Sequence, residues 1–221
     1  MRFSIVIAAY DQQDTLLNAI ESALNQTVKA EVIVVNDGSP DRTEEIANKY
    51  PVKLISQVNK GLASARNTGL MAMSGDIFLP LDADDILYDN CVEKMTDVFY
   101  KTSADVVAPS FKCFGEASET VILMKNPAIG DFRTANRIPY CSAIRKEALL
   151  ECGGYSPKMT WGWEDYHLWF DLLTRKKKIV TIQEPLFLYR TKQKSMWRES
   201  AKHAPELHAQ LEKDFPNVWP K

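Results

Sequence analysis

Several residue patterns that support common kinds of enzyme site are missing from this 221-residue sequence. Its nine glycines form no GxGxxG after the first apolar run and no GxxxxGK(S/T) anywhere. These absences argue against dinucleotide-binding dehydrogenases and P-loop NTPases. There is also no GxSxG, and the three histidines all lie in the last third of the chain, so histidine-based nucleophilic catalysis is poorly supported.

Cysteine and long apolar runs are equally scarce. The four cysteines form neither a CxxC pair nor a Cys/His spacing typical of zinc sites, and they indicate reduced thiols in a cytosolic chain. No run reaches the roughly 18 consecutive apolar residues of a membrane span. The apolar start resembles a short signal peptide, but Asp11 and polar residues follow it at once, which favours a buried first strand. We therefore expect a cytoplasmic protein whose contact with a membrane, if any, is peripheral.

The charge balance is near zero overall but uneven along the chain. Lys and Arg number 27 against 29 Asp and Glu, which argues against a general nucleic-acid binder. Residues 76–105 nevertheless hold eight acids and two bases, whereas residues 175–202 hold nine bases and two acids. The first region suits a cation, and the second suits a diphosphate or an anionic surface.

Short apolar runs alternate with helical patterns through the first hundred residues, which predicts a doubly wound, mostly parallel α/β sheet. The expected strands are residues 3–9, 32–35, 54–55, 77–81 and 105–108. The expected helices are residues 14–25, 61–73 and 89–101, with another whose N-cap and first residue are Ser39 and Pro40.

The second half of the chain is less regular. We expect a hairpin or loose strands over 111–124, a loop over 126–137, helices over 146–151, 164–175 and 203–213, and strands at 179–182 and 187–189. No repeat or linker is present, so we predict one domain over residues 1–221. Its parts are a regular half (1–109), an irregular half (110–195) and a helical tail (196–221).

Two acidic loops follow predicted strands, where ligands of open α/β sheets collect. They are residues 34–39 and 79–85. Asp82 and Asp84 are two residues apart in an extended segment, so their side chains project to the same side and could act on one cation. Oxygen-only ligands suit Mg²⁺ or Mn²⁺. Such loops also often just cap helices and turns.

Six ordered sequence elements resemble the inverting nucleotide-sugar glycosyltransferases of family 2, which have the GT-A fold. The resemblance covers residues 3 to about 195. Its elements are SIVIAAY (4–10) with SALNQT (22–27), VVNDGS (34–39), NKGLASARNTG (59–69), DADD (82–85), GGY (153–155) and EDYHLW (164–169). It implies that 1–109 binds the nucleotide-sugar and 110–195 the acceptor.

The resemblance also implies roles for residues of the nucleotide half. Asp37 matches the carboxylate that accepts a hydrogen bond from the uracil N–H, which favours a UDP or dTDP donor. Arg66 matches the basic residue beside the base and pyrophosphate. Asp82 would contact the ribose, and Asp84, with Asp82, the metal. The remaining members implied for the nucleotide-sugar site are Ala8, Tyr10, Ala83 and Lys192.

In the second half, the resemblance makes Asp165 the base that takes the proton of the acceptor hydroxyl, with Glu164 in acceptor binding. Trp161 and Trp163 could shield this base and raise its pKa, stack on an acceptor sugar, or merely pack as core or lid. Lys192 stands where many relatives have a histidine, which puts a histidine contact to metal or phosphate in doubt. A lysine could still hold phosphate as a point charge.

The resulting expectation is a glycosyltransferase that uses Mn²⁺ or Mg²⁺, a nucleotide-sugar donor (UDP-linked in the first instance) and a glycan or glycolipid acceptor, with no nucleic-acid partner. A basic C-terminal region could contact an anionic membrane. A sugar-nucleotide pyrophosphorylase would need a glycine-rich loop after the first strand, which is missing. The remaining alternative is an inactive module that binds sugar-nucleotides or acts as a scaffold.

Overall fold

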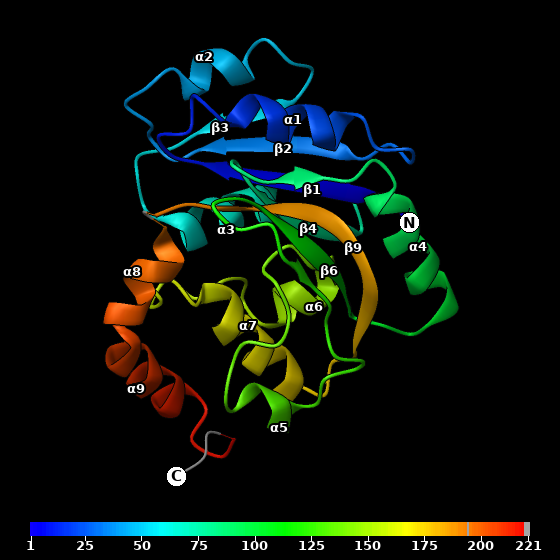
Figure 1. Ribbon diagram of the computed structural model, residues 1–221, viewed down its shortest axis with the longest axis vertical. Helices are drawn as coiled ribbons and strands as arrows, with labels where there is room; N and C mark the ends of the chain where they lie inside the picture. The colour runs from blue at the N-terminus through cyan, green and yellow to red at the C-terminus, as the bar shows by residue number, and fades with distance from the viewer. Residues whose placement is uncertain (194, 219–221) are drawn as a thin grey trace.

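The structure is a computed structural model that describes residues 1–193 and 195–218 (Figure 1). Within these residues nine strands form one mixed sheet in the order β3-β2-β1-β4-β8-β6-β9-β5, with β7 paired to β6. The strands are β1 (Phe3–Ala9), β2 (Glu31–Asn36), β3 (Lys53–Ser56), β4 (Ile77–Asp82), β5 (Ile86–Leu87), β6 (Val106–Gly115), β7 (Thr120–Val121), β8 (Ala143–Arg145) and β9 (Ile179–Thr191).

Helices cover both faces of this sheet (Figure 1). They are α1 (Leu16–Leu24), α2 (Thr43–Ala47), α3 (Leu62–Ala72), α4 (Cys91–Lys101), α5 (Ile129–Phe132), α6 (Lys146–Glu151), α7 (Glu164–Thr174), α8 (Met196–Lys202) and α9 (Ala204–Asp214). None of the helices in the described part of the chain is long and apolar enough to cross a membrane.

The side chains of the first strand show why helices pack on both faces of the sheet. Phe3, Ile5 and Ile7 are buried in the apolar cluster that includes α1 and α4. Val6 and Ala8 alternate with them and are buried in the cluster that includes α3 and α7. Strand β1 pairs in parallel with β2 and β4, so the prediction of a parallel strand that is apolar on both faces is confirmed.

The expected strands and helices of the first half are present to within a few residues, but one helix start was wrong. Helix α2 begins at Thr43, not at Pro40. The Asp41 carboxylate accepts a hydrogen bond from the Thr43 backbone N–H at 2.9 Å and from the Gln13 N–H at 2.8 Å. The residues after Ser39 therefore form a turn tied to the loop after β1 before the helix begins.

The second half departs further from expectation. The two strands predicted at 179–182 and 187–189 are one strand, β9, which pairs in parallel with β6 across an irregularity near Ser110. Pro185 interrupts the apolar pattern without ending the strand. Strands β5 and β8 and helix α8 were not predicted, and α5 lies inside the predicted loop. The predicted hairpin corresponds to β6 and β7.

The strand order places a topological switch at β1. Strand β2 lies on one side of β1 and β4 on the other, and Ala8 of β1 is paired with Asp82 at the carboxyl end of β4. The Asp37 N–H, just past β2, donates to the Ala9 carbonyl at 2.8 Å. Both acidic loops therefore meet beside the end of β1, where open α/β sheets bind ligands.

Candidate active site

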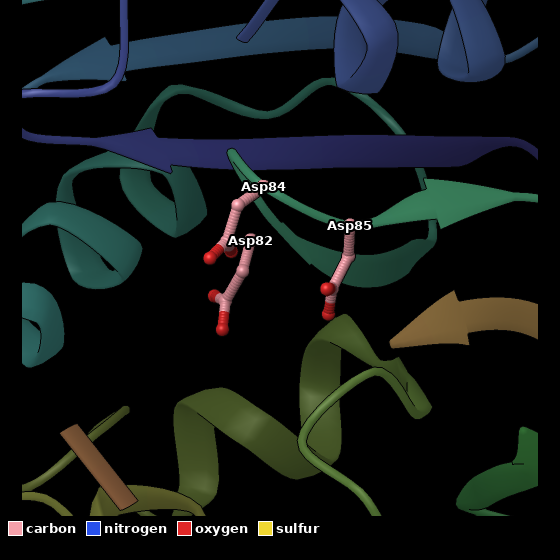
Figure 2. A group of neighbouring side chains, drawn as sticks. All are labelled: Asp82, Asp84 and Asp85. Atoms are coloured by element: carbon pink, nitrogen blue, oxygen red, sulfur yellow. The ribbon is translucent and has the colours of Figure 1, made fainter. Parts of the chain in front are cut away.

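Three aspartates gather in the loop after β4. Carboxylate oxygens of Asp82, Asp84 and Asp85 lie within 4.8 Å of one another. Figure 2 shows the side chains of Asp82 and Asp84 next to each other and pointing to the same side, with Asp85 beyond them. A set of hard carboxylate oxygens of this kind fits Mg²⁺ or Mn²⁺.

Each of the three carboxylates already has a partner from the protein. Asp82 pairs with Arg66 at 2.7 Å, and Asp84 pairs with Lys192 at 2.5 Å. Asp85 accepts a hydrogen bond from the Tyr140 hydroxyl at 2.5 Å and from the Arg190 backbone N–H at 2.7 Å. These partners reduce the repulsion among three neighbouring negative charges.

Burial raises the pKa of two of these carboxyl groups, those of Asp82 and Asp85. Removal from water, offset by Arg66 and reinforced by the charge of Asp84, raises the pKa of Asp82 to about 6. The same removal from water, with the charges of Asp82 and Asp84, holds the pKa of Asp85 well above its usual range. The site is thus one where positive charge is favourable.

Arg66 connects this loop to α7. Its two terminal nitrogens contact Asp82 at 2.7 Å and Glu164 at 2.6 Å, and its guanidinium lies over the rings of Tyr140 and Tyr155 at 5.0 and 5.3 Å. Only 1% of Arg66 is exposed. The structure therefore places Arg66 between two carboxylates, and not along the cleft that Asp37 lines.

The largest of three adjoining clefts, about 970 Å³, lies over the carboxyl ends of β1, β2 and β4. It brings together most of the residues predicted to bind the nucleotide-sugar. Its lining includes Ala8, Tyr10, Asp37, Asp82, Ala83, Asp84, Trp161 and Lys192. Tyr10 is 47% exposed at its rim, and basic side chains of the segment after β9 (Arg198 and Lys202) also line it.

Asp37 is buried, lines this cleft, and also accepts hydrogen bonds from the segment between β3 and α3. One carboxylate oxygen accepts from the Gln57 side chain at 2.7 Å and the Lys60 N–H at 2.9 Å, and the other accepts from the Gly61 N–H at 2.8 Å. A carboxylate oxygen can accept two hydrogen bonds. The second oxygen, with one of these bonds, retains capacity for a ligand N–H.

A second cleft, about 530 Å³, is lined by Asp82 and Arg66 on one side and by Trp163, Glu164 and Asp165 on the other. Asp165 accepts hydrogen bonds from the Asn136 side chain at 2.9 Å and the Tyr166 N–H at 2.7 Å. Burial, together with the neighbouring charge of Glu164, raises the pKa of Asp165 to about 7. Such a carboxylate is poised to accept a proton near neutral pH.

The two tryptophans before α7 contact the C-terminal helices. The Trp161 ring stacks on His203 with centroids 4.0 Å apart, and it is 45% exposed. The Trp163 indole N–H donates to the Ser200 hydroxyl at 3.2 Å. Trp163 adopts a left-handed backbone, φ 65°, at the N-cap of α7, a conformation that non-glycine residues adopt mainly at constrained sites.

A third cleft, about 900 Å³, extends from Asp165 toward the β6–β7 hairpin. Besides Asp165, three of its residues (Asn136, Tyr140 and Tyr189) also line the second cleft, and Tyr189 lines all three clefts. Sequence reasoning assigned these three no role. Asn136 lies in a stretch without periodicity, whereas Tyr189 ends a predicted strand, residues 187–189.

Two of the sequence elements touch each other. The Asn67 side chain donates to the Tyr155 carbonyl at 2.8 Å and accepts from the Tyr155 N–H at 2.7 Å. Gly154 has φ 83°, and a Cβ placed there would lie 2.4 Å from Asn67 Oδ1. The glycine pair and the helix residue after Arg66 are therefore a structural clamp that holds α3 against the segment leading to α7.

Comparisons with known proteins agree on one family. A family model described as "Glycosyl transferase family 2" matches residues 4–167. The minor teichoic acid biosynthesis protein GgaB of Bacillus subtilis (strain 168) is 31% identical over 209 residues, which cover 86% of this chain and 23% of that protein.

Solved structures agree on the fold. TarS 1–349 of S. aureus, in complex with UDP-GlcNAc, gives a TM-score of 0.83 at 16% identity, covering 100% of this chain and 68% of that one. The mannosyltransferase PcManGT of Pyrobaculum calidifontis, in complex with GDP-Man and Mn²⁺, gives 0.74 at 18% identity, covering 96% and 64%. This chain spans only 18–33% of the length of the first curated relatives it matches.

Proposed function

This chain belongs to glycosyltransferase family 2 and has the GT-A fold, and from that premise we propose the reaction that it catalyses. It transfers one sugar, with inversion at the anomeric carbon, from a UDP-type or dTDP-type donor to a hydroxyl of a glycan or glycolipid. Residues 1–109 bind the donor, residues 110–195 bind the acceptor, and residues 196–221, of which 219–221 lie outside the described residues, form a helical tail.

One observation carries this proposal: the cleft over the strand ends and the cleft at α7 share Asp82 as a wall. Asp165 lines the second of these clefts and also the third. A donor held over β1 and β4 would thus present its sugar toward Asp165, and an acceptor could approach Asp165 from the opposite side. This is the arrangement that a direct displacement requires.

For the donor, Asp37 and the end of β1 would hold the base, and Asp82 and Asp84 would hold Mn²⁺ or Mg²⁺ against the diphosphate. A divalent cation there would offset the negative charge that grows on the departing diphosphate. Support comes from the two structural neighbours, one solved with UDP-GlcNAc and the other with GDP-Man and Mn²⁺. Arg66 donates a hydrogen bond to the Asp82 carboxylate and so fixes its orientation.

For the acceptor, Asp165 takes the proton of the attacking hydroxyl. The hydroxyl oxygen forms a bond to the anomeric carbon while the bond from that carbon to the diphosphate oxygen breaks, so the configuration inverts. The hydrogen bond from Asn136 fixes the orientation of the Asp165 carboxylate. Contacts of Trp161 and Trp163 with the tail helices place the indoles at the border of this site.

The basic region after β9 could also bring the enzyme to an anionic membrane that carries a lipid-linked acceptor, with the protein itself in the cytoplasm.

The test is a screen for nucleotide release from UDP-, dTDP- and GDP-sugars with Mn²⁺, followed by NMR of the anomeric configuration of the product. We expect UDP release from one UDP-sugar, its loss on chelation of the metal, and an inverted product. Binding of UDP with no release from any donor would instead support the inactive binding module. Retained configuration would contradict the direct displacement.

A further inference from the structure

The partners of the acidic loop differ in how easily they can leave. Arg66 is 1% exposed and pairs with two carboxylates, and Tyr140 is 8% exposed. The Arg190 partner of Asp85 is a backbone N–H at the end of β9. The Lys192 side chain is 41% exposed and follows the last residue of β9. Among these side-chain partners, Lys192 is the most exposed, and its contact with Asp84 is the easiest to break.

Lys192 also contacts an aspartate that we propose as a metal ligand. Its ammonium nitrogen lies 2.5 Å from an oxygen of Asp84, the aspartate proposed as the principal metal ligand. Two cations so close to one carboxylate would repel each other strongly. A divalent cation bound at Asp84 would therefore weaken the pair between Lys192 and Asp84 and favour release of the lysine.

A donor bound in the cleft would offer Lys192 a second partner. Lys192 lines both the largest cleft, over the strand ends (the donor cleft), and the third cleft, which extends from Asp165 toward the β6–β7 hairpin. Its flexible four-carbon stem is therefore anchored where these two clefts meet. A lysine ammonium binds phosphate as a compact point charge. The diphosphate of a donor in this cleft would offer it a new counter-ion at the moment when Asp84 becomes unavailable.

We propose that Lys192 is an exchangeable internal counter-ion, which holds Asp84 in the empty enzyme and moves to the donor diphosphate when Asp84 takes up the divalent cation. The exchange rests on the proposed donor site. It makes metal and nucleotide binding cooperative, because each ligand removes part of the cost of binding the other. By linkage, UDP must strengthen Mn²⁺ binding by the same factor as Mn²⁺ strengthens UDP binding.

The experiment measures the Mn²⁺ affinity of the protein by electron paramagnetic resonance of free Mn²⁺, with and without UDP. The variant is Lys192→Met, which keeps the length of the side chain and removes its charge. The matched control is Lys202→Met, because Lys202 lines the same donor cleft but pairs with Glu199 at 2.6 Å. Both substitutions change the net charge equally.

We expect Lys192→Met to raise the Mn²⁺ affinity of the nucleotide-free protein about tenfold, within the usual range of coupling between sites. It should also reduce the gain in Mn²⁺ affinity that UDP brings. Lys202→Met should change the nucleotide-free affinity less than twofold. Lys192→Gln should have the same effect as Lys192→Met. Agreement between the two variants would show that the effect comes from the lost charge and not from the packing of the methionine side chain.

Equal effects of the two lysine variants, or no effect of Lys192→Met, would overturn the exchange. Asp84→Asn separates this failure from that of the proposed function. If Asp84→Asn abolishes Mn²⁺ binding while Lys192→Met changes nothing, the metal site stands and only the exchange is wrong. If Asp84→Asn leaves Mn²⁺ binding intact, the metal assignment itself is wrong, and the exchange falls with it.

Discussion

Asp165 is the residue on which the proposed chemistry depends most directly. Asp165→Asn keeps the shape of the side chain and an oxygen for the Tyr166 N–H but removes the proton acceptor. We expect transfer to fall by about 10³-fold, within the range for general-base catalysis, with UDP affinity unchanged by calorimetry. Asp171→Asn, on the same helix but paired with Arg175, is the control. Transfer by Asp165→Asn at the wild-type rate would place the base elsewhere.

The raised pKa of Asp165, about 7, predicts the pH profile of transfer. The base must be ionised, so the rate should fall about tenfold per unit below pH 7 and level off above it. A raised carboxylate pKa also means that its stabilising contribution is present at acid pH and lost as the pH rises through 7. Asp165→Asn should therefore melt no lower than wild type at pH 8. A rate that is flat from pH 5.5 to 8 would contradict this.

Arg66 is expected to matter for stability more than for donor contact. Arg66→Met would leave Asp82 and Glu164 without their shared cation, and breaking a buried ion pair typically costs about 3–5 kcal/mol. Urea unfolding measures this cost, and Arg66→Lys should recover part of it because the charge remains. A loss below about 1 kcal/mol in Arg66→Met would show that the two carboxylates are well solvated in the folded state.

Most of the residues predicted from the sequence to bind the nucleotide-sugar line the donor cleft, but the side chains that pair with them inside the protein were not predicted. A motif reports which side chains stand near a strand end, as with Asp82 and Asp84, because strand ends of one sheet meet at one edge. It does not report which side chain from a distant segment arrives there. Tyr140 and Asn136 come from an aperiodic stretch, and the pairing of Arg66 with Glu164 joins residues 98 positions apart.

At the scale of elements, the contact between α3 and the glycine pair allows a sharp comparison of two neighbouring residues. Gly153 and Gly154 both have positive φ, 76° and 83°, so alanine at either costs about 1–2 kcal/mol of backbone energy. A Cβ at Gly153 meets nothing within 4 Å, whereas a Cβ at Gly154 would lie 2.4 Å from Asn67. We expect Gly154→Ala to be the less stable variant in urea by about 1–3 kcal/mol. Equal stabilities would mean that Asn67 is not a fixed clamp.

The elements that could be predicted are those long enough to show a pattern of apolar residues in the sequence. Strands β1, β2 and β4 are buried on both faces and stand out as apolar runs. Strands β5 and β8 have only two and three residues, too few for any period. Strand β9 was divided because Pro185 resembles a break, although the shift in its pairing with β6 accommodates it.

At the scale of the whole molecule, the fold divides the basic stretch that the sequence shows as one run. Arg175 and the three lysines after it precede β9, and Arg190 and Lys192 lie at its other end. A straight strand of 13 residues would be about 40 Å long. Only the far end of β9 borders the donor cleft, so the basic residues that precede β9 lie away from the proposed phosphate site.

The sheet also predicts how the molecule unfolds. Strand β6 crosses from the first half into the second and pairs with both β8 and β9, so the halves cannot separate at residue 109 without breaking it. We expect one calorimetric transition with an enthalpy of about 150 kcal/mol near 60 °C, equal to the van't Hoff value. UDP with Mn²⁺ should shift this transition as a whole. Two resolved transitions, only one of which moves with UDP, would show instead that the donor half folds independently and that the single-domain prediction is wrong.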